Sequence, residues 1–266
     1  MSLLRTLLTP FTFPFSLVYG SIIWIRNKLY DREWFSSFSF DIPIISVGNI
    51  TTGGSGKTPL VMYLADLLQQ NGKNLGIVSR GYGRKSRGMV TVHNGKELIT
   101  DVENSGDEPY LMASVLKTVP VVVCKDRHEG ISQLIKNNST DVIIMDDGFQ
   151  HRKVKRDLDI VTISANDQKE DYRMLPWGKL REPLHYISRA NAVIFTRTDN
   201  YNPPKLLQGI KPFVKGELLL STQQLTLMKY DGDGYGKSLP PENSLFAFCG
   251  IGEPKSFLDS IAKLGL

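Results

Sequence analysis

A glycine-rich turn ending in Gly-Lys-Thr carries the clearest chemical signal in the chain. Residues 45–68, ISVGNITTGGSGKTPLVMYLADLL, read as a hydrophobic strand, a turn and an amphipathic helix. Glycines let successive backbone N–H groups face phosphate oxygens, and the helix N-terminus adds positive potential. Lys57 can reach the β- and γ-phosphates, while the Thr58 hydroxyl can bind Mg²⁺. The predicted nucleotide-binding loop comprises Thr51, Thr52, Gly53, Gly54, Ser55, Gly56, Lys57 and Thr58.

This loop departs at one position from the usual pattern, Gly-x-x-x-x-Gly-Lys-[Ser/Thr]. Thr51 stands where the first glycine is expected. The change alters the mouth of the loop and spares the groups that touch phosphate. A glycine-rich turn with a chance Gly-Lys-Thr is the alternative, but the strand before it and the helix after it favour a nucleotide site.

Two acidic stretches could complete such a site. TDVIIMDDG is an apolar strand ending in Asp146 and Asp147, and an aspartate placed there holds Mg²⁺ directly or through water. SGDEP contains Asp107 and Glu108. Both pairs have a structural alternative, because acids also cap strand-to-loop turns and begin helices.

The stretch NAVIFTRTD supports a rival interpretation. A strand followed by Thr-Arg-Thr-Asp loosely matches the Asn-Lys-x-Asp turn by which GTPases bind guanine. Asp199 fits this turn and Arg197 is basic, but Thr196 replaces the asparagine. The second hypothesis is therefore a GTPase or ATPase switch, or a metallochaperone-type NTPase, without a lipid substrate.

The chain alternates short Val/Ile-rich strands with helical patterns. Strands are expected at IPIISVG, LGIVSRGYG, PVVVCKD, TDVIIMDDG, LDIVTISA and NAVIFTRTD, and a hairpin with Asn94-Gly95 at its turn. This pattern predicts an α/β, P-loop NTPase-like fold with a largely parallel sheet covered on both faces. Residues 37–215 would form that domain. Residues 216–266 would form a β-linker and the start of a second, smaller α/β domain.

Residues 1–36 form a distinct N-terminal region. Residues 6–25 carry no charge, and that length could cross a bilayer. Pro10 and Pro14 should break the first half, leaving a helix over about residues 15–30. Its aromatic residues and basic end suit a membrane surface, as does the net charge of +5. The alternative is a helix that docks on the protein's own core.

Five motifs together resemble one family, the tetraacyldisaccharide 4'-kinases of lipid A biosynthesis. In order they are SVGNITTGGSGKTP, VSRGYGR, SGDEP, DDGFQHR and LPWGKLREP. The resemblance implies transfer of the γ-phosphate of ATP to the 4'-hydroxyl of a tetraacyldisaccharide 1-phosphate. It implies Mg²⁺ as cofactor, a lipid disaccharide substrate and work at the cytoplasmic face of the bacterial inner membrane. No nucleic acid or protein partner is expected.

The resemblance also implies residue roles. Asp107 would be the catalytic base toward the acceptor hydroxyl, and Lys57 the catalytic lysine. Glu108, Asp146 and Thr58 would serve Mg²⁺, with Asp147 as ligand or orienting group. Arg181 and Glu182 would line the nucleotide or acceptor site.

That family continues into a second domain with an Asp-His-His motif. No such motif occurs up to Leu266. We therefore expect these 266 residues to bind Mg-ATP and to transfer phosphate to lipid poorly.

Overall fold

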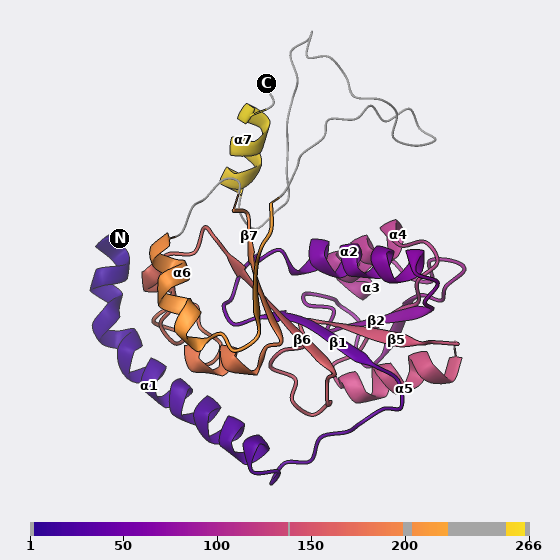
Figure 1. The fold of residues 1–266 in the computed structure, drawn as a ribbon, viewed down its shortest axis with the longest axis horizontal. Helices are drawn as coiled ribbons and strands as arrows, with labels where there is room; N and C mark the ends of the chain where they lie inside the picture. The colour runs from indigo at the N-terminus through magenta and orange to yellow at the C-terminus, as the bar shows by residue number, and fades with distance from the viewer. Residues whose placement is uncertain (1–2, 138, 199–203, 223–253, 264–266) are drawn as a thin grey trace.

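One mixed sheet forms the centre of the molecule. The computed structural model describes residues 3–137, 139–198, 204–222 and 254–263. Within them the strand order is β3-β4-β2-β5-β1-β6-β7-β8. Figure 1 labels β1, β2, β5, β6 and β7 of this sheet. The strands are β1 Ile44–Asn49, β2 Leu75–Ser79, β3 Val90–His93, β4 Val121–Val123, β5 Val142–Asp146, β6 Leu158–Ser164, β7 Ala192–Thr196 and β8 Glu217–Leu220. All neighbours pair in parallel except β3 with β4. The predicted largely parallel sheet is confirmed.

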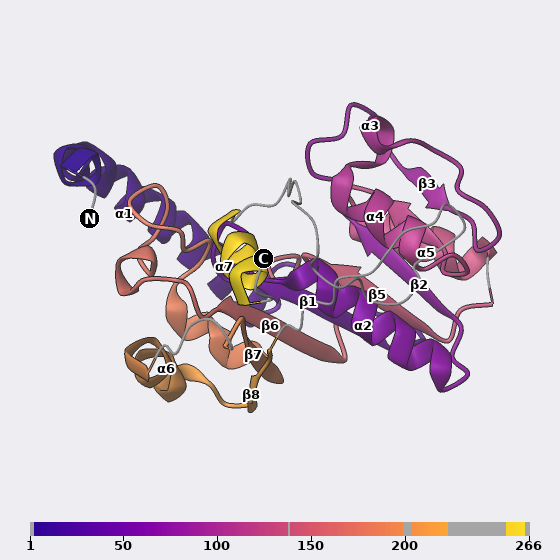
Figure 2. The same ribbon diagram turned by 90° about the horizontal axis from the view of Figure 1, so that it is seen from above.

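Helices cover both faces of this sheet, because its strands are apolar on both sides. In β2, Ile77 packs into a cluster with Val61 of α2 (Lys57–Gln70) and Met112 of α4 (Asp107–Val115). The next residue, Val78, points the other way, into a cluster with Ile131 of α5 (Arg127–Asn137). Because successive side chains of a strand point to opposite faces, β2 contributes to the hydrophobic core on each side of the sheet. Figure 2, seen from above, shows α2 and α4 running along the sheet.

A third cluster covers β6 and β7. It holds the buried residues Phe149, Val161, Ile187, Phe195 and Ile210. Three further helices are short: α3 Val102–Ser105, α6 Pro204–Ile210 and α7 Pro254–Lys263. The described chain also has 3-10 turns at Lys169–Asp171, Leu184–Arg189 and Lys211–Phe213. β8 pairs with β7 and extends the sheet past residue 216. The domain boundaries stay a prediction.

The strand order places a crossover point at β1. In the sheet, β1 lies between β5 and β6, and both strands pair parallel to it. In open α/β sheets, ligands bind outside the carboxyl ends of strands at such a point. The residues after β1 are the glycine-rich loop, and those after β5 begin with Asp147.

The N-terminal helix differs from the expectation. α1 runs without interruption from Leu3 to Asp31, so the predicted break at Pro10 and Pro14 is wrong. A proline inside a helix costs about 3 kcal/mol, and contacts with the core act against that cost. The ring of Phe13 meets Trp177 edge-on at 5.1 Å, and Ser16 Oγ donates to Met174 O at 2.9 Å. Within the described residues, no helix is both long and apolar enough to span a bilayer.

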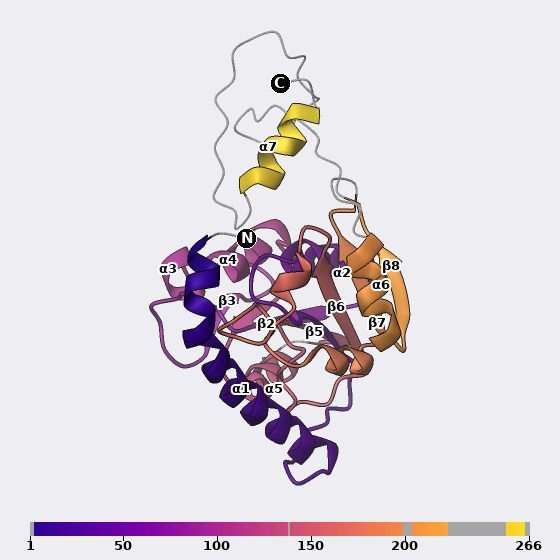
Figure 3. The same cartoon turned by 90° about the vertical axis from the view of Figure 1, so that its left-hand side faces the viewer.

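The two faces of α1 have opposite chemistry. Its inner face meets the protein through buried Ser16 and Asn27 and through Tyr19. Its outer face exposes an apolar stripe at helical spacing, formed by Phe11, Phe15, Val18, Ile22 and Ile25. Figure 3 shows α1 in indigo, lying diagonally across one side of the molecule. The helix therefore docks on the core, as the alternative interpretation held, and still presents an apolar surface to solvent.

One smaller expectation is confirmed. Asn94-Gly95 lies at a turn, where Asn94 Oδ1 accepts from the N–H groups of Lys96 and Glu97. Cys124 is buried and forms no disulfide among the described residues, and Cys249 lies outside them.

The close approach of β1 to the segment after β5 gives a first prediction. A Cβ on Gly48 would lie 2.6 Å from Phe149 Cβ and 2.8 Å from Phe149 N. We expect Gly48→Ala to lower the free energy of unfolding by about 1–3 kcal/mol, measured by urea denaturation. Gly209→Ala is the control, because its Cβ would meet no atom within 4 Å. Equal stability of the Gly48→Ala protein and wild type would contradict the packing.

Candidate active site

The glycine-rich loop ends in a left-handed residue that starts the helix. Gly56 has φ 79° and ψ 21° and caps α2, whose first residue is Lys57. Gly53 has φ 113°. L side chains rarely adopt either value, so these two positions require glycine. The turn therefore delivers the helix N-terminus and Lys57 to the carboxyl edge of β1, as a phosphate loop must.

Buried polar contacts hold the loop from beneath. Ser55 Oγ lies 2.7 Å from Thr162 Oγ1 and accepts from Asn49 Nδ2 at 3.0 Å. Thr196 Oγ1 donates to Ser55 O at 3.1 Å. Because its hydroxyl is occupied inside the protein, Ser55 can offer a ligand only its backbone.

Thr51 replaces glycine without strain, for a reason the structure shows. It forms an antiparallel bridge with Leu180. Flanking hydrogen bonds join Thr52 N to Lys179 O and Arg181 N to Ile50 O, both at 2.8 Å. Bridge pairing uses extended backbone, which any residue can adopt. The first residues of the loop are thus hydrogen-bonded through their backbone to residues 179–181.

A cavity of about 910 Å³ opens beside this loop. Among the predicted site residues, its lining includes Thr52, Gly53, Lys57, Asp107, Glu108, Asp146, Asp147, Arg181 and Glu182. Thr51, Gly54, Ser55, Gly56 and Thr58 belong to the loop and the start of α2 and do not line it. The structure therefore brings residues from four separate stretches of the chain to one place.

The carboxyl group of Asp146 has the burial and the unpaired oxygen expected of a cation ligand. It is 1% exposed; Oδ2 accepts from Ser79 Oγ at 2.7 Å, while Oδ1 has no hydrogen-bond partner within the described chain. Burial raises the pKa of this carboxyl to about 6, and the charges of Glu108 and Asp147 add to the shift. An unpaired buried oxygen is costly unless something compensates it. Hard oxygen donors are those that Mg²⁺ prefers, usually one or two carboxylates with phosphates and water.

Asp147 is already paired with two cations. Arg181 Nη1 donates to both of its oxygens, at 2.8 and 2.9 Å, and Lys57 Nζ lies 3.7 Å away. Burial acts to raise the pKa of Asp147, but Lys57 and Arg181 outweigh it and hold the pKa below its usual value. Its backbone is left-handed, with φ 51°. Strain of this kind in a non-glycine residue gathers at functional sites.

Asp107 and Glu108 are the first two residues of α4. Both side chains are exposed, and both line the cavity. Gly106, with φ 90°, lets the chain turn tightly there, since a Cβ would lie 2.9 Å from Tyr82 O. The acids begin a helix, as the structural alternative held, and also face the cavity.

Glu182 differs from the other predicted site residues, because its carboxylate accepts hydrogen bonds from three residues inside the protein. It is buried, with its oxygens bonded to Asn27, Gln150 and Arg189. Direct contact of Glu182 with a ligand stays a prediction.

Sequence reasoning missed several side chains of the cavity wall. Arg127 is buried, and its guanidinium donates to Cys124 O at 2.8 Å and Asp146 O at 3.3 Å. The others are Tyr19, Ile23, Arg26, Ser79, Arg80, Tyr82, Pro109, Lys125, Gln150, His151 and Leu175. Burial and the charge of Arg127 lower the pKa of His151 to about 4, so it is neutral near pH 7. Most follow the carboxyl ends of β2, β4 and β5, a position that could have identified them.

The rival guanine-reading turn is only partly described. Thr196 contacts the loop and Arg197 Nη1 lies 3.5 Å from Ser164 Oγ. Asp199, on which that interpretation depends, lies outside the described residues.

The fold and the loop together define the class. A parallel sheet, a strand–loop–helix unit with left-handed glycines, and acids at the end of a neighbouring strand are the parts of a P-loop nucleoside-triphosphate-binding protein.

Comparison with known proteins gives the family within that class. A profile of the Tetraacyldisaccharide-1-P 4'-kinase family matches residues 8–266, and the chain belongs to this family. Tetraacyldisaccharide 4'-kinases of Chlorobaculum parvum and Aquifex aeolicus are each 42% identical over 95% of the chain, which spans 71% and 77% of them. The crystal structure of LpxK from Aquifex aeolicus in complex with ATP matches with a TM-score of 0.82 at 40% identity, covering 99% of this chain and 79% of that one.

Asp146 gives a prediction that separates stability from function. Because its pKa is raised to about 6 in the folded state, the protonated carboxyl stabilises the fold, and this contribution is lost as the pH rises through about 6. We expect Asp146→Asn to raise the free energy of unfolding by about 1–3 kcal/mol at pH 7.5 without ligand. The gain should disappear below about pH 4.

Urea denaturation at both pH values measures this. A loss of stability at pH 7.5 would mean that the carboxylate is paired in the folded protein. Ser79→Ala is the matched control, since it removes the hydrogen bond to Oδ2 and leaves the charge.

Proposed function

We propose that the chain is an ATP-dependent lipid kinase of lipid A biosynthesis. It transfers the γ-phosphate of ATP to the 4'-hydroxyl of a tetraacyldisaccharide 1-phosphate. Membership of the kinase family supports this function over a GTPase or metallochaperone switch. The structural observation that carries it is the single cavity shared by Lys57, Asp107 and Asp146.

Charge and position account for the proposed roles. The loop N–H groups and Lys57 take the β- and γ-phosphates, because phosphoryl transfer needs mainly positioning and neutralisation of charge. Asp146 and Glu108 would hold Mg²⁺ with Thr58, and the ion would supply further neutralisation between the phosphates. Asp147 orients Lys57 and Arg181, to which it is already paired.

Asp107 is the proposed base toward the acceptor hydroxyl. It is exposed to the cavity at the start of α4 and makes no ion pair among the described residues. A base must lie within hydrogen-bond reach of the proton it accepts, and an unpaired carboxylate on the cavity wall can offer this to an incoming hydroxyl.

The acceptor is a lipid, and α1 suits a lipid surface. Its apolar stripe faces away from the core, and Tyr19, Ile23 and Arg26 of its inner face line the cavity. Amphipathic helices with aromatic and basic residues lie in the membrane interface. We propose that the protein binds the cytoplasmic face of the bacterial inner membrane through this stripe, which would bring the cavity to the headgroups.

One assay tests the function. Labelled γ-phosphate transfer from ATP to a tetraacyldisaccharide 1-phosphate is measured in detergent micelles, beside hydrolysis of ATP and GTP without lipid. The Aquifex aeolicus relative serves as the positive control. We expect lipid-dependent transfer; GTP-preferring hydrolysis without lipid would support the switch instead. The weak transfer expected of these 266 residues stays a prediction.

Asp107→Asn keeps the shape of the side chain and removes its charge. We expect kcat to fall about 10²–10⁴-fold, the range for a lost general base. Binding of a fluorescent ATP analogue should change little, because the role is at the acceptor. Leu111→Asn on the exposed face of α4 is the control. Loss of nucleotide binding in parallel with turnover would make Asp107 a metal ligand or structural residue.

The outer stripe of α1 can be tested without disturbing its inner face. We expect the triple change Phe15→Ser, Val18→Ser and Ile22→Ser to abolish most sedimentation with vesicles containing anionic phospholipid. Burial of each large side chain in a bilayer contributes about 1.5–3 kcal/mol. The KM for ATP should stay within about twofold. Unchanged sedimentation would show that the stripe does not contact the membrane. The control is the double change Leu111→Ser and Val115→Ser, at two exposed apolar residues of α4.

A further inference from the structure

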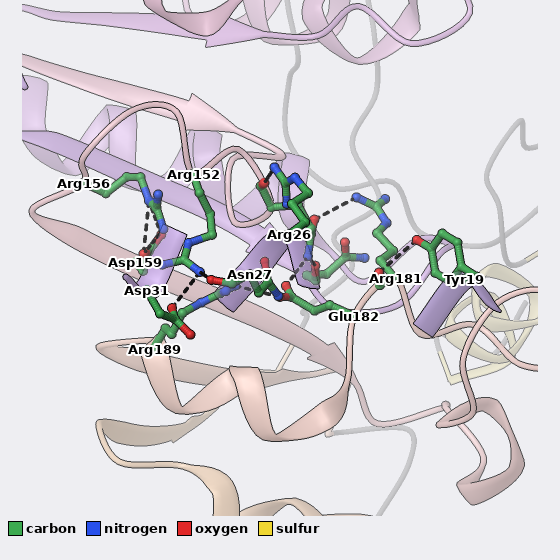
Figure 4. Close-up of polar contacts among 12 residues, drawn as sticks. Tyr19, Arg26, Asn27, Asp31, Arg152, Arg156, Asp159, Arg181, Glu182 and Arg189 are labelled. Carbon is green, nitrogen blue, oxygen red and sulfur yellow. Dashed lines mark hydrogen bonds and ion pairs between the residues drawn. The ribbon is translucent and has the colours of Figure 1, made fainter. Parts of the chain in front are cut away.

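A buried carboxylate joins helix α1 to the cavity wall. Glu182 is 1% exposed, and its oxygens accept three hydrogen bonds (Figure 4). Asn27 Nδ2 of α1 donates to Oε2 at 3.1 Å, Arg189 Nη2 to Oε2 at 2.8 Å, and Gln150 Nε2 to Oε1 at 2.9 Å. A carboxylate has about four acceptor positions, so most of this one is used inside the protein.

Gln150 connects this carboxylate to the charged pair in the cavity. Its Nε2 also donates to Asn49 O at the end of β1, at 2.8 Å. Its Oε1 faces Arg181 Nη1 at 3.3 Å. That same nitrogen donates to Asp147. Glu182 therefore fixes the amide that lies beside the Arg181–Asp147 pair.

Helix α1 makes two further contacts with the same group. Tyr19 Oη donates to Arg181 O at 2.9 Å, and Arg26 Nη2 donates to Gln150 O at 2.8 Å. Figure 4 shows Tyr19 meeting Arg181 from the α1 side and Asn27 meeting Glu182. The helix thus holds the backbones of Arg181 and Gln150 and, through Asn27, the carboxylate that holds the Gln150 side chain.

We propose that Glu182 is a positioning residue, through which the seating of α1 sets the Arg181–Asp147 pair for phosphoryl transfer. This rests on the proposed kinase function. Lys57 lies 3.7 Å from Asp147, so a displacement of Arg181 moves the partner of the phosphate-binding lysine. Misplacement of catalytic groups by about 1 Å can cost up to about 10²-fold in rate. The helix with the apolar outer face is then part of the catalytic geometry.

Asn27→Ala is the decisive variant, because Asn27 bonds Glu182 and does not line the cavity. We expect kcat for lipid phosphorylation to fall about 5–10-fold, with the KM values for ATP and lipid within about twofold, since binding groups are untouched. Ser16→Ala is the matched control. It also removes one bond between α1 and the core, to Met174 O, but no bond to the Glu182 network, and its kcat should equal that of wild type.

Glu182→Gln tests the carboxylate at the centre of this network. It keeps the shape and replaces one acceptor by a donor, so it cannot satisfy Asn27, Arg189 and Gln150 together. We expect a similar fall in kcat. The double variant Asn27→Ala, Glu182→Gln should lose no more than the worse single variant, because both act on one interaction. Additive losses would overturn the proposal.

A second measurement needs no turnover. Amide hydrogen exchange over residues 146–151 in the substrate-free protein should quicken in Asn27→Ala and Glu182→Gln and not in Ser16→Ala. Unchanged exchange in all three would overturn the positioning role, as would equal kcat in Asn27→Ala and wild type. Absence of lipid phosphorylation in wild type refutes the kinase proposal instead, and exchange then still decides the positioning role. Thermal unfolding confirms that each variant is folded.

Discussion

The parallel arrangement of β1, β2, β4, β5 and β6 is the constraint on which the site depends. Parallel strands end at the same edge, so the residues that follow them meet whatever their distance in sequence. This places the loop after β1, Ser79 of β2 and the two aspartates at the end of β5 around one cavity. The same arrangement brings the two aspartates close to each other and to Lys57 and Arg181. One carboxyl of the aspartate pair is satisfied by Lys57 and Arg181, and the other is left buried, with a raised pKa. The edge stores a cost in stability that a bound cation can offset.

Much of this arrangement was readable from the sequence, because it rests on local rules. Val/Ile-rich runs predicted the strands, and the glycines before Gly-Lys-Thr marked the loop. The acids at the end of a buried strand followed from residue type and position alone. Thr51 was harder. Its tolerance depends on a bridge to Leu180, a residue more than a hundred positions away, and no local rule could supply that partner.

The side chains that were missed share a physical reason. Asn27 and Gln150 act by hydrogen bonds between distant segments, both to Glu182, and single polar residues give no periodic signal. The N-terminal helix was misjudged for the same reason. Local propensity argues against a helix through Pro10 and Pro14, whereas docking contacts made by Phe13 and Ser16 decide the outcome. Tertiary contacts override propensity where the local preference is worth only a few kcal/mol.

The wall of the cavity is partly built from α1, through Tyr19, Ile23 and Arg26. A small molecule that fills this space would touch the phosphate loop on one side and the helix on the other. Its affinity would then report the state of the helix as well as the nucleotide site. If α1 lies on a bilayer as we propose, compounds screened against the protein in solution and against the protein on bilayers would rank differently, because the bilayer would contact the outer face of the same helix.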